Sequence, residues 1–79
     1  MWNQRESPPR IEKRFEFEEY QKISIFLKKS DELCKEKNIY PNISFGKNFV
    51  CVSIFLDSEE ILSDEKEFSL RLDNYFLEK

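Results

Sequence analysis

The spacing of apolar residues changes twice along this chain, and that change constrains the fold more than any other feature. Between residues 10 and 18 apolar and charged side chains alternate, a period of two that is typical of a half-buried strand. From about residue 18 the apolar positions recur every three or four residues, which predicts a helix over 18–38. We expect Glu18 and Glu19 in its first turn and Asn38 at its C-terminal cap.

The second half of the chain returns to the strand period. Residues 42–45 predict a short strand and 49–56 a longer one, and the only glycine, Gly46, is expected to supply a positive φ in the turn between them. In the longer strand one face carries Val50, Val52, Ile54 and Leu56, and the other carries Phe49, Cys51, Ser53 and Phe55. A polar loop over 57–60 and an N-cap at Ser63 precede a final helix predicted over 64–77.

This order of elements predicts the α+β class. Strands that follow one another along the chain favour an antiparallel sheet of three to four strands, with two main helices packed on one face. The helices are expected on the face that carries Val50 and Val52. We expect one domain over residues 1–79, in which residues 1–9 form an N-terminal arm or an edge strand.

Composition removes several classes of function. The chain contains no histidine, which excludes histidine-based acid–base catalysis. Cys34 and Cys51 lack CxxC spacing, so we expect no metal and no cofactor. A net charge of −3 with both signs intermixed favours neither nucleic acid nor an anionic membrane as partner. No apolar run approaches the length of a membrane span and no signal-peptide core is present, so a cytoplasmic protein is expected.

Several runs of residues together resemble the pterin-4a-carbinolamine dehydratase family over about residues 10–76. These runs are Arg14-Phe15-Glu16-Phe17, Phe26-Leu27, Asn38-Ile39-Tyr40-Pro41, Val50-x-Val52-x-Ile54 and Leu62-Ser63-x-Glu65. Three further runs, Met1-Trp2, Pro8-Pro9-Arg10-Ile11-Glu12 and the segment 40–46, look like a branch of short members. That branch is associated with α-carboxysomes and assists the assembly of RuBisCO. The resemblance implies a RuBisCO assembly factor that is cytoplasmic or carboxysome-associated, binds RuBisCO, forms a homodimer and uses no cofactor.

The catalytic motif of the family is replaced in this chain. The His-His-Pro motif of active dehydratases falls on Ile39-Tyr40-Pro41, the acidic position of the motif falls on Lys35, and a further histidine position falls near Asp57. Dehydration needs a proton donor and acceptor that titrate near neutral pH. The resemblance therefore implies a non-catalytic protein with a vestigial site at these five positions. The alternatives are a divergent dehydratase that uses Glu36, Asp57 or Tyr40, and a dimerisation cofactor for a transcription factor.

Seven residues are candidates for an interface: Arg10, Tyr40, Phe45, Lys47, Phe49, Cys51 and Phe55. Phe49, Cys51 and Phe55 either form an interface with a subunit or client, or Phe49 and Phe55 are covered by the N-terminal arm or by the twist of the sheet. Tyr40 either fills the former active-site pocket, the interpretation we favour, or anchors a partner together with Phe45 and Lys47 on one rim. Arginines in the N-terminal region either pair with neighbouring glutamates or contact an acidic client.

Overall fold

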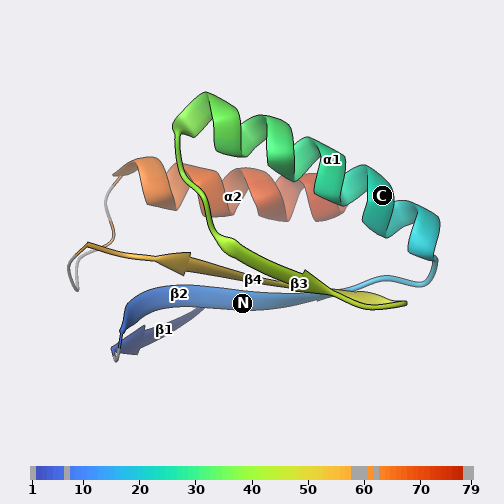
Figure 1. Cartoon of the computed structure of the whole chain (residues 1–79), viewed down its shortest axis with the longest axis horizontal. Helices are drawn as coiled ribbons and strands as arrows, with labels where there is room; N and C mark the ends of the chain where they lie inside the picture. The colour runs from blue at the N-terminus through green and yellow to red at the C-terminus, as the bar shows by residue number, and fades with distance from the viewer. Residues whose placement is uncertain (1, 7, 58–60, 62, 78–79) are drawn as a thin grey trace.

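The protein is built as one four-stranded antiparallel sheet with two helices on one of its faces (Figure 1). The computed structural model describes residues 2–6, 8–57, 61 and 63–77. The elements are β1 (Asn3–Glu6), β2 (Pro9–Glu16), α1 (Tyr20–Lys37), β3 (Asn42–Phe45), β4 (Phe49–Phe55) and α2 (Ser63–Leu77). The strand order is β1-β2-β4-β3. The predicted fold class is confirmed, and β1 is the edge strand that was one of the two expectations for the N-terminus.

The core lies between the helices and the two central strands, β2 and β4. Ile11 pairs with Ile54, and Phe15 pairs with Val50. Residues directly opposite each other on an antiparallel ladder point to the same face, and these four side chains face the helices and are at most 3% exposed. The helices complete the core with Ile23, Phe26, Leu33, Cys34, Phe68 and Leu72. Tyr20, the first residue of α1, lies outside this core, with its side chain 53% exposed.

Helix α1 begins later than its acidic residues predict. The backbone N–H of Phe17 donates to the carbonyl of Asn48 at 2.8 Å, so the chain stays extended beyond the end of β2. Glu19 is then the N-cap residue with extended backbone angles, and the first turn contains no acidic residue. The prediction that Glu18 and Glu19 lie in the first turn is wrong. The predicted C-terminal cap is confirmed: Asn38 is left-handed at φ 57° and its N–H donates to the carbonyl of Cys34.

The turn between β3 and β4 contains Gly46, whose missing side chain leaves room for a neighbouring ring and whose φ is not positive. Within the described residues no glycine has a positive φ, so that prediction for Gly46 is wrong. A Cβ on Gly46 would instead lie 2.9 Å from Cζ and 3.0 Å from Cδ1 of Phe49. The ring of Phe49 therefore occupies the place of the missing side chain, and the Gly46 N–H donates to the Phe49 carbonyl at 3.0 Å.

Helix α2 begins at Ser63, one residue earlier than predicted, and has Asp64 and Glu65 in its first turn. Acidic residues there interact favourably with the positive end of the helix dipole. Most of the predicted polar loop, residues 58–60, and Leu62 before the expected cap lie outside the described residues.

Candidate functional site

The sheet face opposite the helices, called the outer face below, carries four of the seven predicted interface residues. These are Arg10, Phe49, Cys51 and Phe55. Their strands are neighbours, and the register sets Arg10 opposite Phe55. Phe55 is 45% exposed, whereas Phe49 and Cys51 are half-buried. Strand β1 pairs beside β2 in the same sheet and does not lie over β4 (Figure 1), so the described N-terminal residues do not cover this face.

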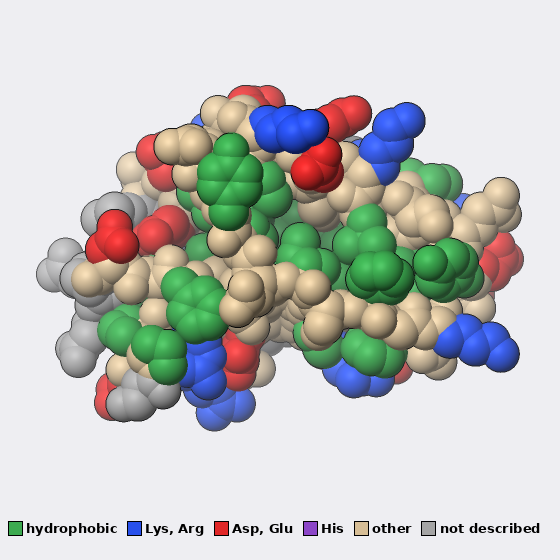
Figure 2. Space-filling model, viewed as in Figure 1, with side chains coloured by type: hydrophobic (Ala, Val, Ile, Leu, Met, Phe, Trp, Pro, Cys, Tyr) green, Lys and Arg blue, Asp and Glu red, His purple; other side chains and the backbone are tan. Residues whose placement is uncertain are grey.

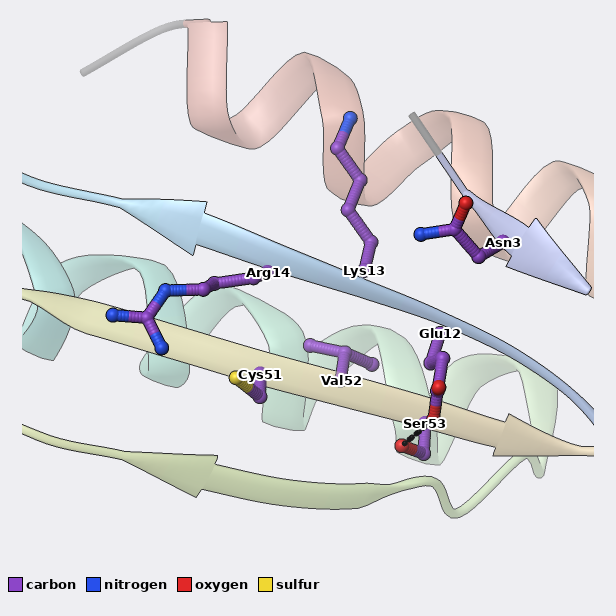
Figure 3. A pocket seen from close by; sticks show the side chains of 7 residues that line it. All are labelled: Asn3, Glu12, Lys13, Arg14, Cys51, Val52 and Ser53. Carbon is purple, nitrogen blue, oxygen red and sulfur yellow. Dashed lines mark hydrogen bonds between the residues drawn. The ribbon is translucent and has the colours of Figure 1, made fainter.

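A shallow hollow of about 270 Å³ opens on the outer face between β1, β2 and β4. It is lined by Asn3, Glu12, Lys13, Arg14, Cys51, Val52 and Ser53 (Figure 3). The side chain of Lys13 points toward α2 in Figure 3, where its Nζ lies 2.8 Å from Asp73, so Lys13 lines the hollow with its backbone. The surface is recessed at the middle of the outer face because the β4 residues there, Cys51 and Ser53, have small side chains.

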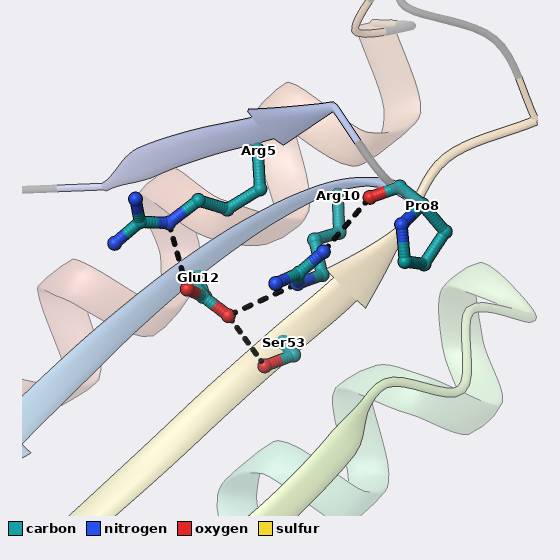
Figure 4. A network of polar contacts seen from close by, with 5 residues as sticks. All are labelled: Arg5, Pro8, Arg10, Glu12 and Ser53. Atoms are coloured by element: carbon teal, nitrogen blue, oxygen red, sulfur yellow. Dashed lines mark hydrogen bonds and ion pairs between the residues drawn. The ribbon is translucent and has the colours of Figure 1, made fainter.

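Glu12 is the centre of the polar contacts on the outer face (Figure 4). Its carboxylate accepts hydrogen bonds from Nε of Arg5 at 3.0 Å and from Nε of Arg10 at 3.2 Å, and from the hydroxyl of Ser53 at 3.3 Å. The hydrogen bond from Arg5, followed by that from Arg10, lowers the pKa of Glu12 below its usual range. In the sequence, Glu12 is one of the charged residues that alternate with apolar ones between residues 10 and 18. That position indicated that its side chain points away from the core. The contact with Arg5 depends on the pairing of β1 with β2, which no local pattern contains.

Arg14 has two partners on the same face. Its Nε lies 3.3 Å from Glu16, and its guanidinium lies 4.2 Å from the centre of the Phe49 ring. A cation over an aromatic face is attracted by the ring quadrupole. Each of the three N-terminal arginines therefore contacts a glutamate, as one of the two sequence-based interpretations expected.

The other predicted interface residues do not share the outer face. The register pairs Phe45 with Val50, whose side chain faces the helices, so Phe45 lies on the helix side at the edge of the sheet, 49% exposed. Tyr40 precedes β3 and Lys47 follows it, so the two lie at opposite ends of this strand. Apolar side chains do gather along the flank of the molecule that β3 forms (Figure 2). The prediction that Tyr40, Phe45 and Lys47 form one rim is wrong.

The predicted vestigial positions lie toward one end of the sheet. The ladder between β3 and β4 has Asn42 opposite Ser53, so both the segment 39–41 and Asp57 lie beyond that end. Lys35 lies in the last turn of α1, which leads into this segment. Ile39 is partly buried against the core, whereas Tyr40 is 69% exposed. A tyrosine this exposed does not fill a pocket, so the interpretation favoured from the sequence is wrong.

A solved structure matches this arrangement along nearly the whole chain. It is a pterin dehydratase-like protein that was identified as a RuBisCO assembly factor in the alpha-carboxysome. The TM-score is 0.84 and the sequence identity 29%, over 95% of this chain and 88% of that one. This chain has the pterin dehydratase-like fold. No protein-family model matches it, and no curated protein sequence does.

Within the pterin dehydratase-like fold, Glu36 is the acidic residue next to the predicted vestigial position Lys35 on α1, and its carboxylate binds an arginine of α2. Glu36 accepts a hydrogen bond from Nη1 of Arg71 at 2.6 Å, which links α1 to α2. This hydrogen bond is the main reason that the pKa of Glu36 lies below its usual range. A carboxylate held in its ionised form by an arginine is a poor proton donor at neutral pH.

Neither a metal site nor a membrane span is found where the structure describes the chain. Across residues 2–6, 8–57, 61 and 63–77, no three acidic or cysteine side chains are arranged to hold a metal ion. No helix within those ranges is long and apolar enough to cross a bilayer. Cys34 and Cys51 are free thiols, and burial raises the pKa of Cys34.

Proposed function

We propose that this protein is a non-catalytic RuBisCO assembly factor of the α-carboxysome that acts as a chaperone by binding protein. The observation that carries the proposal is the match to a solved assembly factor, at 29% identity and TM-score 0.84 over nearly the full length of both chains. Fold similarity by itself does not establish function. The proposal therefore also depends on the chemistry of the residues at the former catalytic positions.

Those residues favour binding over catalysis. The chain contains no histidine, and Ile39, Tyr40 and Pro41 stand where active dehydratases carry His-His-Pro. Of the residues named for a divergent dehydratase, Glu36 is engaged by Arg71, and Tyr40 and Asp57 are exposed to solvent. General acid–base catalysis works best with a side chain that is enclosed and held against the substrate, and the solvent-exposed Tyr40 and Asp57 are not enclosed in this way.

The mechanism we propose is transient masking of RuBisCO subunit surface during folding or assembly, in the cytoplasm or in association with the carboxysome. The outer face is a suitable surface for this purpose, because it combines exposed aromatic and charged groups without a helix packed over it. We propose further that the protein acts as a homodimer, which sedimentation equilibrium of the purified chain would test.

The central experiment is co-expression with the large and small subunits of the cognate RuBisCO. We expect more soluble, assembled RuBisCO, measured by native gel and carboxylase activity, than in a matched strain that lacks this chain. We also expect an isolable complex with unassembled large subunit. No gain in assembled enzyme and no complex would refute the function.

A separate assay addresses catalysis. The purified chain is expected to convert a pterin 4a-carbinolamine no faster than buffer does, measured by the absorbance change of the dehydrated product. Turnover that depends on Glu36, lost in Glu36→Gln, would instead support a divergent dehydratase.

A further inference from the structure

The outer face contains an unfavourable arrangement of charge at the pair formed by Arg5 and Arg10. These two arginines are direct partners on the β1–β2 ladder, so their side chains project from the same face. Like charges directly opposite each other destabilise a sheet. One carboxylate, that of Glu12, accepts a hydrogen bond from both. Two guanidinium groups thus share one internal counter-charge.

The arginines of this face also keep unused hydrogen-bond donors. Arg5 contacts Glu12 and Arg14 contacts Glu16 through Nε, and in the part of the chain that the structure describes the terminal nitrogens of both have no hydrogen-bond partner. Their side chains are 56% and 53% exposed. A guanidinium carries five N–H donors in a fork that fits a carboxylate. The donors that remain are available to an acidic group from outside the chain.

The surplus of positive charge is local. The outer face carries Arg5, Arg10 and Arg14 against Glu12 and Glu16, whereas the whole chain has a net charge of −3. With three arginines against two glutamates, the face has one surplus positive charge within a protein of net charge −3. Electrostatic complementarity between an interface and its partner steers the encounter and sets orientation, so an acidic partner is favoured here over a basic one.

The shape of the face adds a second requirement. Along β4 the outer row has aromatic residues at both ends, Phe49 and Phe55, and small residues between them, Cys51 and Ser53. Residues two apart on a strand are separated by about 7 Å, so Cys51 and Ser53 together form a recess only a few side chains long. Its volume of about 270 Å³ has room for one or two side chains rather than a folded domain. An extended chain whose carboxylates alternate with apolar side chains matches both the charge and the hollow.

We propose that the outer face docks an acidic, extended segment of the client protein. Carboxylates of the segment pair with the guanidinium groups of Arg5 and Arg14, and an apolar side chain enters the hollow over Cys51. This inference deepens the proposed function and rests on it, because the client it assumes is RuBisCO.

The test measures binding of the full chain to unassembled large subunit of RuBisCO at low and high salt. The double variant Arg5→Gln/Arg14→Gln is expected to bind about tenfold more weakly at low salt, with a smaller effect of salt, because it loses two exposed charge contacts. The matched control Lys22→Gln/Lys28→Gln removes the same charge from exposed positions on α1. It is expected to bind within about twofold of the wild-type chain, since rim charges act locally.

A conservative variant separates charge from folding. Arg5→Lys/Arg14→Lys keeps both positive charges, and we expect it to recover at least half of the lost binding free energy and the salt dependence. Circular dichroism and thermal unfolding verify that all variants are folded. If the glutamine and lysine variants bind equally weakly, or if the control binds as weakly as the arginine variant, the docking surface is wrong.

Three further outcomes are informative. If the wild-type chain binds RuBisCO and the arginine variants bind equally well, the outer face is not the docking surface, while the proposed function stands. If the wild-type chain does not bind, the proposed function fails first. If sedimentation shows that the arginine variants dissociate a dimer of this chain, or if the face binds RNA more tightly than the subunit, the face serves another partner and the inference is overturned.

Discussion

The indole nitrogen of Trp2 lies 3.2 Å from each carboxylate oxygen of Asp73, although 71 positions separate the two residues. Lys13 reaches the same carboxylate, with its Nζ 2.8 Å from Oδ1. The ring of Trp2 also meets that of Phe15 edge to face, with centroids 5.9 Å apart. The residues of β1 itself are all exposed. These contacts therefore fasten the start of the edge strand to α2 and to the core.

Replacing Asp73 with alanine should remove this attachment. We expect Asp73→Ala to lower the free energy of unfolding by about 1–3 kcal/mol, because the partly buried Trp2 and Lys13 donors lose a charged acceptor. The matched control is Asp31→Ala, which removes an exposed pair with Lys35 within one helix and should lower it by at most about 0.5 kcal/mol. Urea denaturation measures both values. Equal losses in the two variants would show that Asp73 does not fasten β1.

Gly46 and Phe49 should depend on each other. Gly46→Ala is expected to destabilise the protein by about 1–3 kcal/mol, because the new Cβ would overlap the Phe49 ring and force it to move. In a Phe49→Leu background the same substitution should have little effect. A double-mutant cycle by chemical denaturation measures the coupling. A loss that is the same in both backgrounds would point to backbone strain at Gly46 instead.

The left-handed Asn38 predicts a definite order of stability at one position. With φ at 57°, glycine adopts this conformation most easily, asparagine next, and alanine least. We expect Asn38→Ala to be about 1 kcal/mol less stable than Asn38→Gly. Thermal unfolding of the three proteins at one pH provides the comparison. An alanine variant as stable as the glycine variant would contradict the assigned cap.

The lowered pKa of Glu12 predicts a pH dependence of stability. Because the folded pKa lies below the usual value of 4.5, the unfolded state binds more protons at intermediate pH. The contribution of this carboxylate is therefore complete above 4.5 and decreases as the pH falls through the folded pKa. Stability curves from neutral to acidic pH should fall less steeply in Glu12→Gln than in the wild-type chain.

The cause of this shift can be tested directly. Removing the main hydrogen bond with Arg5→Gln should raise the pKa of Glu12 toward its usual value, because Arg5 stabilises the ionised form. Carboxyl NMR titration measures the pKa in each protein. Lys22→Gln removes an equal charge on the helix layer and should leave the titration of Glu12 where it is. A titration unchanged by the loss of Arg5 would contradict the geometry.

Local patterns were sufficient to predict most of the secondary structure of this protein. The alternation around Ile11 and Phe15, the three- and four-residue spacing through Ile23 and Phe26, and the position of Asn38 all describe neighbours in sequence, where geometry is periodic. They predicted the order of strands and helices and the buried side of β4. They failed at Glu18 and Glu19, because the end of the strand is set by a hydrogen bond between Phe17 and Asn48.

The candidate binding surface was predicted less completely. Phe49, Cys51 and Phe55 were expected on one face of their strand because a period of two separates the faces, and they do share the outer face, whereas the position of Arg10 on that face follows from its pairing with Phe55. Phe45 was expected on a rim with Tyr40 and Lys47, but the side on which it projects follows from its pairing with Val50, which no local pattern contains. Glu12 was overlooked as a centre because Arg5 and Ser53 reach it from two different strands.

By itself the sequence determined the elements, their buried stripes and the absence of histidine, since these depend on residue type and short-range spacing. The tertiary structure alone decided which strands are neighbours and in what register. That pairing brings Arg5 against Arg10 on the outer face and Trp2 against Asp73 on the other. Contacts across strands and layers join residues far apart in the chain, and their geometry exists only once the sheet has formed.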